Sequence, residues 1–464
     1  MTPGILTTCA SCAVPIPYTA PRCSKCHTRY CGQACQAQHW NTGGHNRALC
    51  KRIKRAGGAE KYHADQEYNE AVAEAVEKCA FHGALVQQTT GHVPEEATCY
   101  ICTEAVVQRT GEGLVNGFCA CGDRDGVDAG SMGVAHVSCL VRQAELAMDD
   151  EMSRSWASTQ DRFRLWESCR LCGKRYHGDV QRAMGWACWR AHLSKPADHQ
   201  VRRAAMDMLA GSLAENGLHQ EALDIYGASL AIVNHHNPSL LTDRPAISFD
   251  LVQSCMSLQT NIANTLQLLG RHDEAISRHR RILAGKEFML REGGWDAGNF
   301  AAVIARVGSE DRLISILNLC TALIEREPTS GTMLREARSL LRANMADAQR
   351  VLGPDSKYHE YAFSWRGNYV RSIYYDEDAT MDDLREADEV ADAAYEAARQ
   401  TFGEEHPLTE KLERLARGSD SEHSDSEPTV DGGAPPEPDA DHDVARTMQD
   451  EINVDDARGR PEFN

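Results

Sequence analysis

Cysteine and histidine are concentrated in the first part of this 464-residue chain. Fifteen of its 18 cysteines precede residue 173, mostly in pairs separated by one or two residues, while Cys188, Cys255 and Cys320 stand alone. Thiolates and imidazoles are ligands for divalent metal ions, and two residues between cysteines let one tight turn supply two of them. Because the start of the chain shows no secretory signal, the pairs predict metal binding in a reducing compartment and not disulfides.

The first cluster occupies the first fifty residues, where the candidate ligands are Cys9, Cys12, Cys23, Cys26, His27, Cys31, Cys35, His39, His45 and Cys50. Seven cysteines and one histidine would hold two tetrahedral ions. His27 directly adjoins Cys26, a poor spacing for a second ligand, which leaves His39 or His45. So short a segment cannot fold on its apolar core alone, and metal binding would contribute about 10–16 kcal/mol per structural zinc.

This cluster resembles the MYND zinc finger, over about a tenth of the chain. The resemblance is carried by the pairs Cys9/Cys12 and Cys23/Cys26 and by Tyr30-Cys31, Cys35-Gln36, His39-Trp40, His45 and Cys50. It implies two interleaved sites, with Cys9, Cys12, Cys31 and Cys35 on one ion and Cys23, Cys26, His45 and Cys50 on the other. The gaps on either side of His45 are long for this family, so the choice between His39 and His45 stays open. MYND fingers are protein-interaction modules that often bind proline-containing peptides; the alternative is a structural staple without a partner.

A second cluster has the order of four cysteines, one histidine and three cysteines: Cys99, Cys102, Cys119, Cys121, His136, Cys139, Cys169 and Cys172. Together with "CYIC", "HVSCL" and "WESCRLC", this order resembles the RING-CH variant of the RING finger. The resemblance implies one ion on Cys99, Cys102, His136 and Cys139, and one on Cys119, Cys121, Cys169 and Cys172. In total we expect four zinc ions, two per finger.

The RING resemblance implies a partner and no covalent chemistry. RING fingers hold a ubiquitin-conjugating enzyme in an apolar groove, where Ile101 and Trp166 are the candidate contacts, although Trp166 could equally be a core residue. No arginine directly follows Cys172, which puts ligase activity in doubt. The long insert between Cys139 and Cys169 predicts an added helix. A PHD-like or degenerate structural finger is the alternative.

The remainder of the chain has a helical pattern. Cys79 lies in a helical linker, and Trp186, Cys188 and Trp189 are expected to pack a further helix onto the second finger or the next domain. From about residue 200, weak internal matches recur: "GLHQEALDIY" with "GRHDEAISRH", "NIANTL" with "NLCTAL", and "LREARSLL" with "LREADEVA". Such self-similarity predicts stacked helical hairpins.

These matches resemble tetratricopeptide repeats, particularly those of kinesin light chains. We expect four hairpins, with small residues at their close approach: Ala222, Ala275, Ala337 and Ala387. The resemblance implies a superhelix whose concave side holds an extended peptide; the alternative is a helical domain without a groove function.

Charge is unevenly distributed along the sequence. The net charge is −19, of which residues 418–464 carry −11 from 14 acidic and 3 basic residues, which predicts a disordered acidic tail. Ser419 and Ser424 each precede a glutamate by three residues, a pattern that acidophilic kinases accept. The mildly acidic remainder argues against broad nucleic-acid binding. The basic run from Lys51 to Arg55 either contacts an anion or is a solvated helix start. With no apolar stretch long enough for a membrane helix, we expect a cytoplasmic protein, or a nuclear one.

The sequence therefore predicts two small zinc-stapled α+β fingers, an all-α repeat superhelix and a disordered tail. The expected segments are 1–50 (MYND-type finger), 51–98 (helical linker), 99–190 (RING-CH-like finger with a helical extension), 200–417 (repeats) and 418–464 (tail). This order of modules resembles a protein family of unicellular algae. The predicted function is an adaptor resembling a ubiquitin ligase, with a non-enzymatic zinc-dependent scaffold as the alternative. A lysine methyltransferase is excluded because the SET-domain signature is absent.

Overall fold

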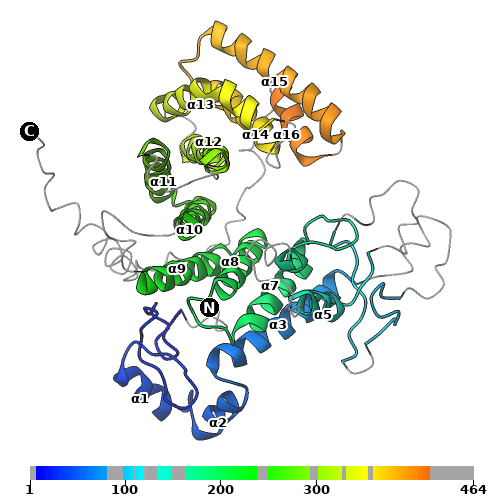
Figure 1. Ribbon diagram of the computed structural model, residues 1–464, viewed down its shortest axis with the longest axis vertical. Coiled ribbons are helices and arrows are strands. Elements are labelled where there is room, and N and C mark those ends of the chain that lie inside the picture. Colours follow the sequence, from blue (N-terminus) through cyan, green and yellow to red (C-terminus); the bar gives the residue numbers. More distant parts are fainter. Residues whose placement is uncertain are drawn as a thin grey trace, which may run out of the picture. The chain divides into compact units, whose positions relative to one another are not determined.

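The computed structural model describes residues 7–80, 98–107, 110–119, 121, 133–148, 162–237, 249–292, 301–326, 331–353, 359–404 and 406–417 (Figure 1). The chain divides into two units, Met1–Ala416 and Arg417–Asn464, and nearly all described residues belong to the first. The expected acidic tail and most of the insert expected to add a helix, 149–161, lie outside the described residues. No helix in the described part is long and apolar enough to cross a membrane.

The first finger consists of two cysteine-bearing turns followed by two short helices, α1 (Gln33–Asn41) and α2 (Arg47–Arg55). The turns are closed by isolated antiparallel bridges, Thr8 with Pro15 and Arg22 with Arg29. The α+β expectation is thus wrong for the described residues, which contain bridges but no β-strand. The reason is length, because each turn has room for one bridge beside its cysteine pair. Buried Tyr30, Ile53 and Ala59 form a small core with the cysteines.

The second finger is built on α3 (Ala59–Lys78), α5 (Val137–Met148), the 3-10 turn η1 (Arg164–Trp166) and α7 (Gly178–His192). Helix α7 contacts all three of the others and also α8, the first repeat helix. Trp186, Cys188 and Trp189 on α7 are each at most 2% exposed, which confirms the packing role predicted for them. Ten of the 15 residues of α7 are buried, so this helix lies in the core.

The described residues of the repeat region form four helical hairpins, the number predicted, followed by one more helix. They are α8 (Gln200–Glu215) with α9 (His219–His236), α10 (Phe249–Leu268) with α11 (His272–Glu292), α12 (Ala301–Arg326) with α13 (Gly331–Val351), α14 (Glu360–Tyr374) with α15 (Met381–Phe402), and α16 (Pro407–Ala416). Beyond sequence neighbours, α8 contacts α10, α10 contacts α12, α12 contacts α14 and α14 contacts α16. The even-numbered helices therefore form one closely spaced layer, and α9, α11, α13 and α15 form the other.

Glycine and alanine set the geometry of these hairpins. Gly217 and Gly270 have positive φ angles of 80° and 73° at matching turns before α9 and α11, a conformation that glycine adopts without a steric penalty. The alanines predicted at the close approach of paired helices are all fully buried: Ala222, Ala275, Ala337 and Ala387. Larger side chains at these positions would force the helices apart.

Buried side chains form two large clusters that meet at α11. The first extends from α3 through the cysteines of the second finger and α7 to α10, and the second covers α12 to α16. The second finger and the first hairpins thus share one core, whereas the first finger has a core of its own.

Candidate metal centres

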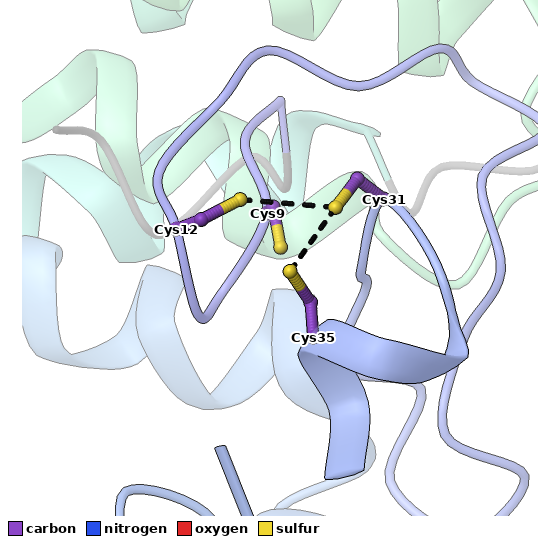
Figure 2. Close-up of side chains that lie close together, drawn as sticks. All are labelled: Cys9, Cys12, Cys31 and Cys35. Atoms are coloured by element: carbon purple, nitrogen blue, oxygen red, sulfur yellow. Dashed lines mark hydrogen bonds between the residues drawn. The ribbon is translucent and has the colours of Figure 1, made fainter. Parts of the chain in front are cut away.

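Cys9, Cys12, Cys31 and Cys35 converge in the first finger, where Figure 2 shows their side chains pointing toward one another. Cys9 and Cys12 come from one turn, whose backbone Cys9 N–H donates to Val14 O at 2.8 Å, and Cys35 lies in the first turn of α1. The Cys12 and Cys31 sulfurs are 3.7 Å apart, and those of Cys31 and Cys35 are 3.3 Å apart. Both Cys12 and Cys31 are exposed, so this group is open to solvent.

The second group of the same finger, Cys23, Cys26, His45 and Cys50, is fully buried. His45 Nε2 lies 3.3 Å from the Cys26 sulfur, while His45 Nδ1 lies 2.8 Å from the Tyr30 hydroxyl. A hydrogen bond from Nδ1–H to the tyrosine oxygen would leave the Nε2 lone pair free for a metal. His39 lies outside the group, with its Nδ1 3.2 Å from the same hydroxyl. Because only His45 reaches the cysteines of the group, this geometry favours His45 over His39 as the ligand.

Cys99, Cys102, His136 and Cys139 form a third group in the second finger. His136 precedes α5 and Cys139 lies in its first turn, so one helix start supplies two of the four side chains. His136 Nδ1 lies 3.4 Å from the Cys102 sulfur and 3.7 Å from that of Cys139. Nδ1 therefore faces the sulfurs and is the nitrogen available to a metal, while the buried Nε2 has no hydrogen-bond partner in the part of the chain that the structure describes.

The fourth group comprises Cys119, Cys121, Cys169 and Cys172, with the Cys121 and Cys169 sulfurs 3.6 Å apart. Gly133 is required beside it, because its φ is 85° and an added Cβ would lie 2.7 Å from the Cys121 Cβ. No simple spacing rule marks this glycine, which the sequence analysis missed.

All four groups fit a tetrahedral ion. Zinc–sulfur bonds of about 2.3 Å place neighbouring sulfurs about 3.8 Å apart, and the ligand atoms of every group lie within 4.8 Å of one another. Sets of thiolates with at most one imidazole suit zinc better than magnesium or calcium. Each group could therefore hold one metal ion, and the structure assembles the same sets of four that the two resemblances imply. That the ion is zinc stays a prediction.

The turns also favour the thiolate form of the cysteine. Burial opposes ionisation of Cys9, Cys23 and Cys99, but hydrogen bonds from nearby backbone N–H groups and cysteine side chains outweigh it, so all three have a lowered pKa, that of Cys9 about 6. A hydrogen bond from the Cys119 side chain, together with the backbone N–H groups of Cys172 and Leu171, lowers the pKa of Cys169 to about 5. One cysteine in each group is thus held near its metal-binding form.

The remaining cysteines lie outside the four groups. Cys188 and Cys320 are fully buried in the helical cores, and Cys79 and Cys255 are half-buried. Burial raises the thiol pKa of all four, which favours the neutral, unreactive form.

The two candidate partner contacts differ in exposure. Ile101 is half-buried, and its N–H donates to the Cys99 sulfur at 3.4 Å. Trp166 is fully buried, with its ring edge-on to His192 at a centroid distance of 5.9 Å. Trp166 is therefore a core residue and not a partner contact, which is the alternative that the sequence left open. Val106 and Leu171, which no sequence motif marked, are 48% and 44% exposed and lie close in the sequence to ligands of the third and fourth groups.

A cavity of about 630 Å³ opens between the second finger and the first even-numbered helices, where its lining includes Glu167, Gln181, Asp207 and Asn261. Burial raises the pKa of Asp207 to about 7, although the Ser229 hydroxyl donates to it at 3.1 Å. Burial likewise raises the pKa of Glu167. The cavity is thus polar and lies next to the even-numbered layer.

No protein-family model and no curated protein matches this sequence, so neither finger resemblance is confirmed by a family match. Two solved structures are similar to it, both described as nearly identical TPR-like repeats of a putative kinesin light chain from Podosopora anserina, one of them with a single substitution. They share 17% and 18% identity, cover 57% of this chain and 97% and 98% of their own, and each has a TM-score of 0.33. The hairpin architecture of this chain rests instead on the contacts between its own helices.

Proposed function

We propose that this protein is a zinc-dependent scaffold that assembles protein partners. The observation that carries the proposal is the shared core, in which α7 contacts both the second finger and α8. The second finger and the first repeat helix are thereby joined through packed side chains and not through a flexible linker. Such an arrangement presents two surfaces in a fixed relation, which is what a scaffold requires.

Zinc is the ion we assign to all four groups, on the ligand sets Cys9, Cys12, Cys31, Cys35; Cys23, Cys26, His45, Cys50; Cys99, Cys102, His136, Cys139; and Cys119, Cys121, Cys169, Cys172. Each set supplies four protein ligands, the pattern of structural and not catalytic zinc. The ion would stabilise the fold of each finger and present its surface.

Partner peptides are expected on the first finger and on the even-numbered layer. The polar cavity beside α8 and α10 offers an amide, Asn261, and carboxyl groups to a peptide backbone or side chain. Stacked hairpins commonly bind extended peptides along one layer, which supports this placement.

Recruitment of a ubiquitin-conjugating enzyme is the second candidate function. It is supported by Val106 and Leu171, exposed apolar side chains near the third and fourth groups, with half-buried Ile101 between two ligands of the third. Gly173 stands where active ligases often have an arginine, which favours a finger that binds without activating.

Metal analysis combined with an autoubiquitination assay tests both functions. We expect four equivalents of zinc per chain, and loss of partner binding after chelation. Autoubiquitination with any of a panel of conjugating enzymes, lost in Leu171→Ala but retained in the surface control Leu268→Ala, would favour the second candidate. Markedly fewer than four equivalents of metal would contradict the scaffold.

A further inference from the structure

The first finger is strongly basic on an otherwise acidic protein. Residues 1–59 contain eight basic residues and no acidic one, a net charge of +8. Residues 60–417, by contrast, carry −16. Seven thiolates and two divalent ions would together add −3, so the finger stays at +5 with its metals bound.

Six of these cations lie on two segments of the finger, and we call them the basic patch: Arg22, Lys25, Arg47, Lys51, Lys54 and Arg55. All six side chains are exposed. At 3.6 residues per turn, the four on α2 share one side of the helix, opposite the buried Ile53. Lys25 and Lys51 each adjoin a cysteine of the second metal group, Cys26 and Cys50, so that group brings the two segments together.

The cations of the basic patch have no ion-pair or hydrogen-bond partner among the residues that the structure describes. The other two basic side chains of the finger do have partners: Arg29 pairs with Glu60 at 3.9 Å, and Arg52 lies over the Tyr62 ring at 5.5 Å. Unpaired like charges along one side of a helix repel one another, at a cost that a bound anion would reduce. The patch therefore has the electrostatics of a binding surface for an anionic partner.

The size and surroundings of the patch limit what that partner can be. Its α2 stripe spans about 12 Å at 1.5 Å per residue. A long nucleic acid would extend beyond it onto the acidic body, where phosphates are repelled. A membrane surface is disfavoured too, because Cys50 and Ile53, at 5% and 3% exposed, leave α2 without an apolar face to insert.

We propose that the basic patch binds a short acidic peptide segment of a partner protein. The proposal names a partner class for the first finger of the proposed scaffold, and it requires only that this finger folds around its metals. Acidic side chains on a peptide of about ten residues would match the stripe of cations along α2.

The test is fluorescence anisotropy of a labelled decaglutamate peptide on the full chain. We expect saturable binding at low salt that weakens at least about tenfold at 0.3 M salt. Lys54→Glu/Arg55→Glu should weaken binding at least about tenfold, and Lys54→Gln/Arg55→Gln by less. Lys195→Glu/Arg350→Glu, which makes the same change in net charge at exposed positions elsewhere, should change it less than about twofold.

Several outcomes would overturn the proposal. One is that decaglutamate does not bind at low salt, and another is that the control variant loses as much affinity as the patch variant. A third is that single-stranded DNA or phosphatidylserine vesicles bind to the basic patch more tightly than decaglutamate does. Binding only by a chain that ends at Arg417 would show that the chain's own acidic residues are the occupant and not a partner. Four equivalents of metal in each variant show that the fingers are folded, so a failure here is distinct from failure of the scaffold.

Discussion

The two fingers resemble each other in ligand chemistry but differ in how they are built into the protein. The first has its own small core, an exposed metal group and a basic surface. The second shares a core with α3, α7 and the first hairpins, and none of its eight candidate ligands is exposed. Metal bound to the first finger would therefore stabilise a local module, while metal bound to the second would stabilise the start of the repeat region as well.

Removing one ligand from each finger tests this difference most strongly. We expect Cys169→Ala to lose one metal ion and to lower the free energy of unfolding of the helical unit by roughly 5 kcal/mol, because the shared core loses its staple. Cys12→Ala should also lose one ion but leave the helical melting transition in place. Metal content and far-ultraviolet circular dichroism measure the two effects.

Cys255→Ala, a half-buried cysteine outside the metal groups, is the matched control and should keep four ions. Equal shifts of the melting temperature in Cys12→Ala and Cys169→Ala would show that the fingers are coupled to the repeats alike.

Acid should destabilise the second finger by protonating His192. This side chain of α7 is 7% exposed and stacks on Phe163, and burial lowers its pKa to about 4. Because the unfolded chain binds the proton more readily, stability is complete above about pH 6.5 and falls as the pH drops toward 4. At pH 5 the loss is about 2 kcal/mol.

The measurement is urea denaturation of the native chain and of His192→Gln at pH 7 and pH 5. The native chain should lose about 2 kcal/mol more than the variant between the two values. If both lose the same stability, His192 does not carry the acid sensitivity of the junction.

A smaller effect is expected from the N-cap of α2. The Asn46 side chain accepts a hydrogen bond from the Leu49 N–H at 2.9 Å, and α2 carries Cys50. Asn46→Ala should cost about 1 kcal/mol and weaken metal binding by the second group about fivefold. Competition with a chromophoric chelator measures this, while the melting of the repeats should not change. An unaltered competition curve would separate α2 from the metal site.

Much of the site could be predicted because its chemistry is local. A cysteine pair two residues apart and the turn between them are set by a few neighbouring residues, so Cys9 with Cys12 and Cys169 with Cys172 stand out in the sequence. The hairpins were predictable for a similar reason, since Gly217 and Gly270 mark matching turns. The α+β expectation failed because a segment that forms a single bridge has the same sequence pattern as a segment that forms a short strand.

The sequence by itself determined the residue types that could bind four ions, the repeated hairpins and the charge of each segment. Only the tertiary structure decided which histidine faces the first finger's cysteines, since Tyr30 lies against both His39 and His45 while only His45 reaches Cys26. It also decided that Trp166 is buried and that α7 joins the second finger to the repeats. These outcomes depend on packing between segments far apart in the chain, which local spacing does not encode.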